Sequence, residues 1–399
     1  MPYSFDLSKP AFRNVTRKGP LFTLLTALAL LLSSSGSSAQ TWLRLIDYAP
    51  NDNYYGYEIV PTADGGFLVV LQNGYLIKFD AEADTLWTRA LPDSLRYQRE
   101  AQVSSDGMIS LLVYSEGPDD YEDKTITLDN SGNIINVLDQ NEYGNFYPLA
   151  DGYVFGFAHY PSDTVIDLLR VNFAGDTIWQ QQFNGPEKLI NVVEVIRTID
   201  GGFLFYCVEE LVNSYAKRLI KTDAAGTILW SAIVPDAGLE TFRCHLAEEP
   251  DGSIVIMDPE IGTLAFHAVR LSAVGEVLLT KTNYTFYAPT DFELAPDGGF
   301  WAIGEEKSGG LNQLYIRKFR QDFTVEWKRV FNFSDFGTTP RKIARLGAGS
   351  NSFVVLGGVA ASSSASFDTP FIIHPDSLGN LAHNVISGQL RHDVNKNCN

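Results

Sequence analysis

The fold of this chain is decided by a pattern that is complete in the stretch RTIDGGFLFYCVEELVNSYAKRLIKTDAAGTILWSAIVP, residues Arg197 to Pro235. Asp-Gly-Gly precedes one apolar run, and Asp-x-x-Gly precedes a second run that contains Trp230. Glycine at a turn supplies positive φ, and an Asp side chain can accept hydrogen bonds from nearby backbone N–H groups. β-branched and aromatic residues dominate the runs, so the stretch predicts four strands, A to D, in which both glycine motifs are hairpin turns.

The Asp-Gly element recurs along the chain. Its aspartates are Asp64, Asp106, Asp151, Asp200, Asp251 and Asp297, separated by steps of 42, 45, 49, 51 and 46 residues. A degenerate seventh copy, AGSNSFVVLGG, begins at Ala348. Each copy is followed by a second hairpin of the type LIKFDAEADTLWTRAL. A period of this length is typical of the four-stranded blades of a β-propeller.

The stretch TWLRLIDYA, Thr41 to Ala49, matches strand D but has no A, B or C strand before it. A ring of blades must close, because an open stack would leave unpaired strand edges and exposed apolar faces. We therefore predict an all-β protein, a seven-bladed propeller over residues 40–387, in which this stretch is the outer strand of the seventh blade. Eight blades are the alternative.

Strand D carries a tryptophan at one fixed place in four of the repeats, as Trp87, Trp179, Trp230 and Trp327. In the second and fifth repeats we expect Ile135 or its neighbour, and Leu278, in this slot. Because any large apolar side chain fills it, we interpret the slot as packing between blades.

The repeating unit resembles that of secreted propeller proteins of Bacteroidota. It consists of D-G-G, an apolar run and then h-h-K-h-D-x-x-G-x-x-h-W, where h is an apolar residue. It is also similar to the tryptophan-docking repeat of quinoprotein-like propellers and, more broadly, to WD40-like propellers. The resemblance covers Thr41 to about Ser387 and implies a fold, and it implies no particular activity.

Residues 1–39 have the features of a secretory signal peptide. Arg17 and Lys18 precede the apolar run Leu21 to Leu32, and small residues lead to a cleavage site after Ala39. The run is too short to cross a bilayer comfortably, so we expect no transmembrane span after cleavage. We therefore predict a secreted or outer-surface protein.

The whole chain carries a formal charge of −18, and loss of residues 1–39 removes four bases and one acid, which leaves about −21. Such a field repels phosphate backbones, so we expect no nucleic-acid partner. We expect a monomer with a protein or glycan partner.

The segment Ile386 to Asn399 resembles the opening of an Ig-like module found after such propellers, and type IX secretion is implied by the same resemblance. Asp393, Asn395 and Asn397 alternate as the oxygen ligands of calcium loops do, so residues 388–399 are the start of such a module or a polar tail. We expect no cofactor, and calcium at this end is the alternative.

No catalytic motif occurs, and Cys207 and Cys244 either form a disulfide or stay reduced. The B-to-C and D-to-A connections vary in length and share one edge of the ring, where loops on a rigid scaffold usually carry function. Carboxylates and aromatic rings there suit a protein or glycan ligand. The candidate ligand-binding residues are Tyr54, Tyr55, Asp119, Asp120, Tyr147, Glu209, Tyr287, Glu305 and Glu306. The predicted function is a binding or adhesion scaffold, and the alternative is a carbohydrate-active hydrolase or lyase that uses the same carboxylates.

Overall fold

The chain divides into two units, Met1–Ser38 and Ala39–Asn399, and the computed structural model describes residues of the second unit only. The described residues are 41–46, 56–71, 74–92, 95, 97–104, 107–116, 121–140, 144–158, 165–185, 188–211, 215–235, 245–259, 266–283, 289–333, 337–347, 350–360 and 368–381. The expected signal peptide and the expected module at 388–399 lie outside them.

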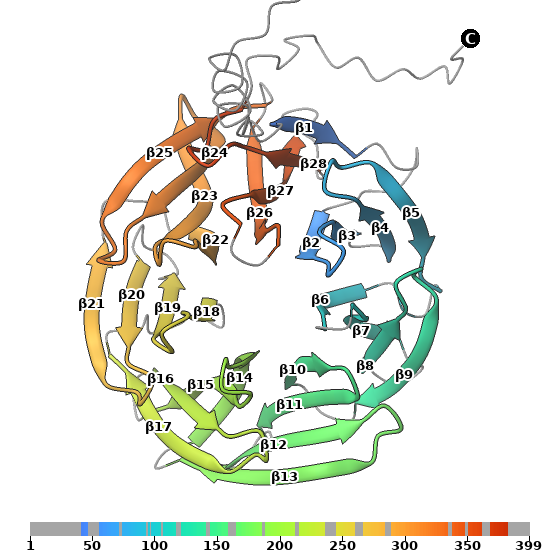
Figure 1. The fold of residues 1–399 in the computed structure, drawn as a ribbon, viewed down its shortest axis with the longest axis vertical. Helices are drawn as coiled ribbons and strands as arrows, with labels where there is room; N and C mark the ends of the chain where they lie inside the picture. Colours follow the sequence, from blue (N-terminus) through green and yellow to red (C-terminus); the bar gives the residue numbers. More distant parts are fainter. Residues whose placement is uncertain are drawn as a thin grey trace, which may run out of the picture. The chain divides into compact units, whose positions relative to one another are not determined.

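Seven antiparallel sheets of four strands make up the second unit, and Figure 1 shows them arranged in a ring with strand A innermost and strand D outermost. Blades 1 and 2 contain β2 (Gly56–Pro61), β3 (Phe67–Leu71), β4 (Tyr75–Phe79), β5 (Thr85–Ala90), β6 (Tyr97–Val103), β7 (Ile109–Glu116), β8 (Tyr121–Leu128) and β9 (Ile134–Gln140). Blades 3 and 4 contain β10 (Gly144–Leu149), β11 (Gly152–Ala158), β12 (Val165–Asn172), β13 (Thr177–Asn184), β14 (Lys188–Arg197), β15 (Phe203–Glu210), β16 (Tyr215–Thr222) and β17 (Ile228–Val234).

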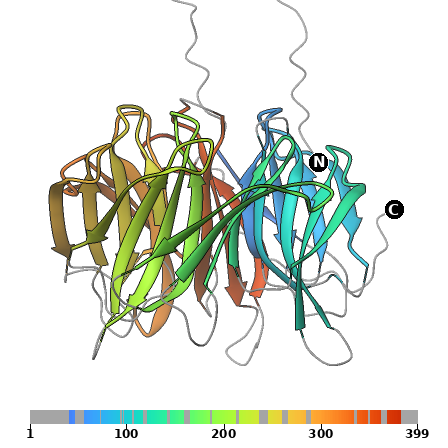
Figure 2. The same ribbon diagram turned by 90° about the horizontal axis from the view of Figure 1, so that it is seen from below.

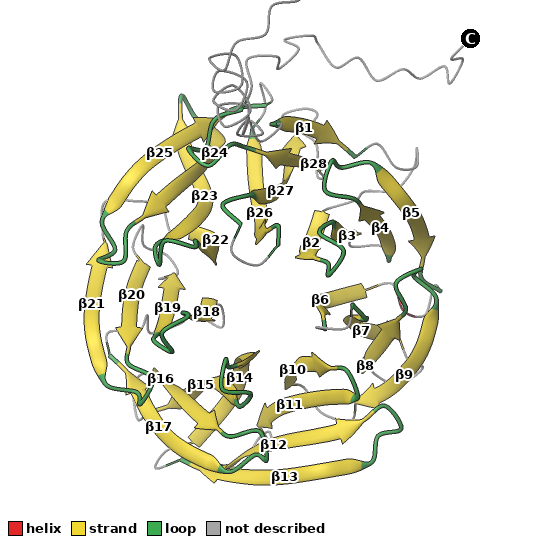
Figure 3. Ribbon diagram, viewed as in Figure 1, coloured by secondary structure: helices red, strands yellow, loops and turns green. Residues whose placement is uncertain are grey.

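Blades 5 and 6 contain β18 (His245–Glu248), β19 (Ile254–Pro259), β20 (Phe266–Leu271), β21 (Val277–Asn283), β22 (Pro289–Leu294), β23 (Phe300–Ser308), β24 (Leu311–Phe319) and β25 (Val325–Phe331). Blade 7 contains β26 (Thr338–Arg345), β27 (Phe353–Ala360), β28 (Asp368–His374) and β1 (Trp42–Leu45). Figure 3 shows that strands are the regular elements of this unit. In the part of the chain that the structure describes, no helix is long and apolar enough to cross a membrane.

The N-terminal strand closes the ring. β1 pairs with β28 in antiparallel register, from Trp42 opposite His374 to Leu45 opposite Phe371, and Ile46 N donates to Pro370 O at 2.9 Å. The prediction of seven blades closed by the N-terminal strand is confirmed, and the alternative of eight blades is wrong.

The core lies between the blades, because strands B and C are covered on both faces. Every residue of β3 is buried, for example, and Leu204 and Tyr206 of blade 4 pack in one cluster with Leu246 and Ile254 of blade 5. Strands buried on both faces read as continuous apolar runs, which explains why the runs after each Asp-Gly turn lack polar alternation.

The register of strands C and D identifies the tryptophan slot in every blade. Trp230 lies opposite Lys221 on β16, and the matching residues are Asn136 in blade 2, Leu279 in blade 5 and Trp42 in blade 7. In blade 2 the slot therefore holds Asn136, a neighbour of Ile135, and the expectation of a large apolar side chain there is wrong, since Asn136 Nδ2 donates to Phe173 O at 2.9 Å. Leu278 was the wrong residue, since its side chain is on the outer face and 57% exposed.

Candidate functional site

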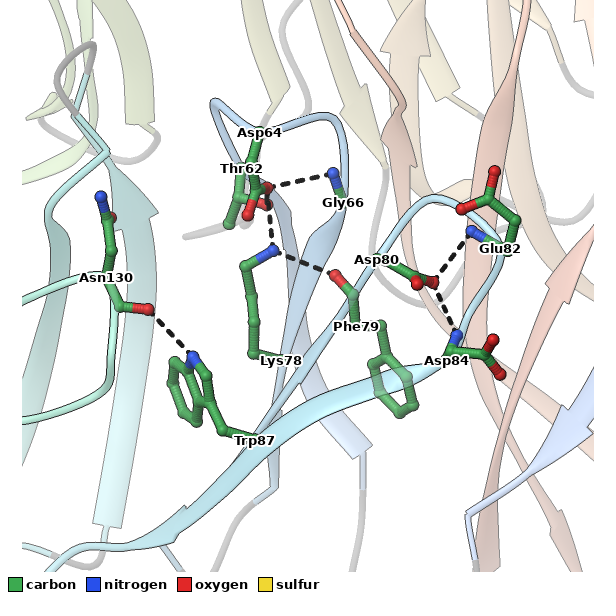
Figure 4. Close-up of polar contacts among 10 residues, drawn as sticks. All are labelled: Thr62, Asp64, Gly66, Lys78, Phe79, Asp80, Glu82, Asp84, Trp87 and Asn130. Carbon is green, nitrogen blue, oxygen red and sulfur yellow. Dashed lines mark hydrogen bonds and ion pairs between the residues drawn. The ribbon is translucent and has the colours of Figure 1, made fainter.

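The A-to-B and C-to-D turns lie at one edge of the ring, seen from the side in Figure 2, and their polar groups are used within the blade. Asp64 Oδ1 accepts hydrogen bonds from Thr62 Oγ1 at 2.6 Å, Lys78 Nζ at 2.8 Å and Gly66 N at 3.2 Å (Figure 4). Partial burial would raise the pKa of Asp64, but these hydrogen bonds outweigh it and hold the pKa below its usual value. The Asp of the repeat therefore closes its own turn and binds a lysine.

The same ion pair recurs in other blades between the turn and the end of strand C. The pairs are Asp200 with Lys221 at 2.9 Å, Asp297 with Lys318 at 2.5 Å, Asp151 with Arg170 at 2.8 Å and Glu249 with Arg270 at 2.5 Å. The lysines Lys78, Lys221 and Lys318 are buried. These carboxylates serve the fold, which leaves the opposite edge as the candidate binding surface.

At that opposite edge the structure places three of the predicted acidic residues at the ends of strands B. Glu209 is fully buried, and its Oε2 accepts from Arg218 Nη2 at 2.9 Å and Arg218 Nε at 3.1 Å. The Arg218 guanidinium also lies 5.7 Å from the ring centre of Phe183 in blade 3. Glu209 is thus part of the joint between blades 3 and 4 and has no exposed carboxylate oxygen to offer a ligand.

Glu305 and Glu306 are half-buried at the end of β23. Glu305 Oε2 accepts from Asn312 Nδ2 at 2.8 Å, and Glu306 forms an ion pair with Lys328. The Arg317 guanidinium lies 4.0 Å from the Glu306 carboxylate. These two carboxylates are adjacent on one strand and remain partly accessible.

Tyr147 lies on β10, two residues before the A-to-B turn, and not in the D-to-A connection where we expected it. Its ring packs edge-on against Phe203 of blade 4, with centroids 6.5 Å apart, and burial raises the pKa of its hydroxyl. The other predicted residues lie outside the described residues: Tyr54, Tyr55, Asp119, Asp120, Tyr287, Asp393, Asn395 and Asn397. Cys207 is a buried free thiol, and Cys244 also lies outside the described residues.

A ring of polar residues on the innermost strands escaped the sequence analysis. Each lies four residues before the residue that opens the A-to-B turn of its blade. The seven residues are Glu58, Glu100, Asn145, Glu194, His245, Asp291 and Lys342, here called the axial ring. In five of the seven blades this residue directly follows a β-bulge of strand A.

Residues of the axial ring bind the backbone of the next blade. Glu194 Oε2 accepts from Leu246 N at 2.9 Å, and Asp291 Oδ2 accepts from Ile343 N at 2.8 Å. The donor side chains make the complementary bond, since Asn145 Nδ2 donates to Val193 O at 2.5 Å. An axial-ring carboxylate therefore accepts a hydrogen bond from the backbone N–H of the residue that follows the axial-ring residue of the next blade. The axial-ring amide instead donates to a backbone C=O in the strand A bulge of the next blade.

Charges of the axial ring converge from blades that are not neighbours. Lys342 Nζ lies 3.2 Å from Glu58 Oε1 and 3.9 Å from Asp291 Oδ1, and its charge also acts on Glu194, three blades away. Burial raises the pKa of both Glu58 and Glu194 to about 7, although Lys342 opposes the shift at Glu58. The carboxylates of Glu58, Glu194 and Asp291 thus all interact with the half-buried Lys342.

His245 is the second basic residue of this ring. Its Nδ1 lies 2.9 Å from Asp291 Oδ1, and its Nε2 lies 3.1 Å from Thr290 O, so both ring nitrogens face acceptors. Burial would lower the pKa of His245, but Asp291 outweighs it and raises the pKa, which favours the doubly protonated imidazolium. Among the described residues, no group of three or more His, Cys, Asp or Glu side chains is arranged to hold a metal ion.

Comparison with known proteins supports the fold. No family model and no curated protein matches the chain. The β-propeller domain of Cps50 (Swd1) from Myceliophteria thermophila is similar with a TM-score of 0.53 and 11% identity, covering 82% of this chain and 99% of that one. A chain of a mitotic checkpoint complex is similar with a TM-score of 0.53 and 12% identity, covering 93% and 98%. BamB from Moraxella catarrhalis has a TM-score of 0.41 and 13% identity, covering 84% and 99%. The two likenesses with a TM-score of 0.53 show a β-propeller fold and say nothing of a ligand.

Proposed function

We propose that this protein is an exported binding scaffold, which holds a protein or glycan partner on the edge formed by its B-to-C and D-to-A connections. The proposal rests on the contrast between the two edges. The B and C strands that end at the B-to-C edge differ in length, from five residues each in β3 and β4 to nine residues each in β23 and β24. The B-to-C connections range from residues 309–310 in blade 6 to residues 361–367 in blade 7.

The opposite edge supports the proposal by exclusion. Its turns repeat one hydrogen-bond pattern from blade to blade, for example Thr62 N to Gly66 O at 2.9 Å and Thr198 N to Gly202 O at 2.9 Å. The aspartates and lysines of these turns are paired with each other. A surface that repeats in this way offers little for a specific partner, whereas variable loops on a rigid frame can be specific.

Two further considerations agree with this function. One similar propeller belongs to a multi-protein assembly, the mitotic checkpoint complex, so a ring of this kind can serve as a component of an assembly. The export signal proposed for residues 1–39 would place the scaffold outside the cytoplasm. Sequencing the N-terminus of the protein recovered from its natural host tests that placement, and an intact Met1 would contradict it.

The decisive experiment compares the two edges. The loop residues Asp119 and Asp120, between β7 and β8, are replaced by Gly-Ser, and Gly201→Val at the opposite edge is the matched control. Both proteins are screened on a glycan array and in pull-downs. We expect the loop variant to keep its stability within about 0.5 kcal/mol but to lose binding, and the control to bind normally. Loss of binding in the control alone would mean that the edges are assigned backwards, and no binding by the unaltered protein would refute the scaffold function.

The hydrolase or lyase alternative has its own test. Turnover of labelled polysaccharides that is abolished by Asp120→Ala or Glu306→Ala would establish it. In the structure the Glu306 carboxylate is paired with Lys328.

A further inference from the structure

The axial ring alternates in charge over five consecutive blades. In the order of blades 4, 5, 6, 7 and 1, its residues are Glu194, His245, Asp291, Lys342 and Glu58. Each basic residue therefore stands between two acids. The alternation stops at blades 2 and 3, where the ring has a second glutamate and a neutral asparagine. Because opposite charges on neighbouring blades attract one another, these five residues, here called the axial lock, draw the inner strands of their blades together.

Ion pairs join four of these residues into one chain of contacts. His245 Nδ1 lies 2.9 Å from Asp291 Oδ1, and Lys342 Nζ lies 3.9 Å from the same oxygen and 3.2 Å from Glu58 Oε1. The side chains of Asp291 and Glu58 are 5% and 9% exposed, so salt and water screen their charges little. A change of charge at one member of the axial lock therefore acts on the next blade.

Two acids of the axial lock also hold backbone amides of the next blade. Glu194 Oε2 accepts from Leu246 N at 2.9 Å, and Asp291 Oδ2 accepts from Ile343 N at 2.8 Å. His245 is the first residue of β18, and Asp291 is the third residue of β22. The axial lock therefore fixes inner strands close to the points where the D-to-A connections enter blades 5 and 6.

His245 is the basic member whose charge changes near neutral pH. The charged groups that face it are Glu194 on β14, Asp291 on β22 and Lys342 on β26. Its partner on β19 is the uncharged Met257. Burial favours the neutral imidazole, but Asp291 outweighs burial and raises the pKa of His245. Because the folded pKa lies above the unfolded value of about 6.5, the stabilising contribution is complete below about pH 6.5 and is lost as pH rises through the folded pKa.

Two glutamates of the axial lock titrate in the same direction. Burial raises the pKa of Glu58 and of Glu194 to about 7. The charged groups around Glu58 are Lys342, Asp291 and Glu100, and those around Glu194 are His245, Lys342 and Glu100. Since both folded pKa values lie above the unfolded value of 4.5, the cost of ionising these carboxyls appears as pH rises from 4.5 to about 7.

Asp291 keeps its negative charge over this range. Burial would raise its pKa, but Lys342 and His245 outweigh burial and lower it. Glu293, on the same strand, is buried beside Arg345, and burial raises its pKa to about 7 as well. A rise in pH therefore removes positive charge and adds negative charge on the same inner wall.

We propose that the axial lock is a pH-sensitive switch built into the ring, which is closed at mildly acidic pH and loosens above neutral pH. In the closed state the alternating charges hold the inner strands of blades 4, 5, 6, 7 and 1 together. Loss of the charge on His245 and ionisation of Glu58 and Glu194 weaken these contacts. The A-to-B turns do not respond in this range, because their ion pairs join aspartates to lysines, as between Asp200 and Lys221.

The melting temperatures of two matched variants between pH 6 and 9 test the proposal. His245→Gln removes the charge and keeps a hydrogen-bond donor. His267→Gln is the control, because His267 lies on β20 of the same blade and its Nδ1 is 3.0 Å from Thr282 Oγ1, outside the axial lock. We expect the melting temperature of the unaltered protein and of the control to fall over this range, and that of His245→Gln to fall less. Equal slopes in all three proteins, or no fall in the unaltered protein, would overturn the proposal.

Hydrogen exchange separates loosening of the axial lock from loosening of the whole ring. The amide of Gly201 donates to Thr198 O at 2.8 Å in an A-to-B turn and serves as the reference. We expect the protection factor of the Leu246 amide to fall about tenfold between pH 6 and 9, because its acceptor has a pKa of about 7 when the lock is closed and 4.5 when it opens. The protection factor of Ile343 should fall as well, and that of Gly201 should stay nearly constant. An equal fall at all three amides would overturn the proposal.

A second variant keeps the proposal testable if His245→Gln does not fold. Asp291→Asn removes the charge that raises the pKa of His245, so the loss of stability should move to lower pH. A loss that begins at the same pH in Asp291→Asn as in the unaltered protein would overturn the proposal.

Discussion

The indole ring of Trp230, on β17 of blade 4, lies on Gly275 in the C-to-D turn of blade 5. A Cβ at Gly275 would come 3.0 Å from the ring, and Trp230 Nε1 donates to Ala273 O at 3.1 Å. Trp87 lies on Gly132 of the next blade in the same way. Its Nε1 donates to Asn130 O at 2.9 Å (Figure 4). The glycine is thus required twice, by its positive φ and by the ring above it.

Between blades 5 and 6 the larger side chain comes from the C-to-D turn and the smaller one from strand D, the reverse of the arrangement at Trp230 and Gly275. Leu279 stands where the tryptophan would be, and Phe323 takes the turn position with φ of 60°, where most other blades have glycine. Phe323 is buried in one cluster with Leu279. A large side chain is thus supplied by the turn where strand D lacks one, at the cost of a strained backbone angle.

We predict that Leu279→Trp and Phe323→Gly are each destabilising and that the double variant is nearly as stable as the unaltered protein. Loss of the buried Phe should cost about 3 to 5 kcal/mol, reduced by about 1 kcal/mol because the strain at φ disappears. The added tryptophan alone would collide with Phe323. Urea unfolding of the four proteins measures the coupling, and simple additivity would show that the two residues do not share one slot.

Substitution of Gly201 tests backbone strain, and substitution of Gly202 in the same turn tests a steric clash. Gly201 has φ of 85° and no heavy atom within 4 Å of an added Cβ, whereas a Cβ at Gly202 would meet Thr222 O at 2.1 Å. Gly201→Val should therefore cost about 1 to 3 kcal/mol through backbone strain. Gly202→Val should cost more, because β15 and β16 must separate. Equal unfolding free energies for the two variants would contradict this assignment.

Stability in acid should depend on Asp200. Its partial burial would raise the pKa, but hydrogen bonds from Thr198 and Lys221 outweigh burial and lower the pKa to about 2. Because the folded pKa lies below the unfolded value, the contribution is present above about pH 4 and is lost as pH falls toward 2. Asp200→Asn should flatten the dependence of melting temperature on pH in this window, and Lys221→Met should flatten it too. An unchanged slope in both variants would remove Asp200 from the acid transition.

Glu194 should lower stability as pH rises, whereas Asp200 lowers it as pH falls. Burial raises its pKa to about 7, so its neutral form is favoured in the folded protein. The cost of ionising it is absent below the unfolded value of about 4.5 and grows as pH rises to 7. Glu194→Gln keeps an oxygen acceptor for Leu246 N, so we expect equal melting temperatures at pH 5 and a higher one for the variant at pH 8. A lower melting temperature at pH 8 would mean that the charged form is stabilising.

The spacing of the Asp-Gly turns, the strand that precedes the first repeat and the repeated tryptophan determined the architecture, including the closure by Trp42–Leu45. These features could be predicted because hairpin turns, strand alternation and a blade period are local properties of the chain. The carboxylates and rings of the candidate edge could be proposed from the loops that contain them.

Contacts between blades could be decided only by the tertiary structure, because they join residues about one repeat or more apart. Glu209 looked like an accessible acid until Arg218 and Phe183 were placed around it, and Tyr147 looked like a loop residue until β10 was defined. The axial ring is visible in the sequence only after seven A strands are aligned on their turns. Phe323 looks like an ordinary turn residue, and the reason for it is Leu279 on another blade, since packing depends on which side chains the closed ring brings together.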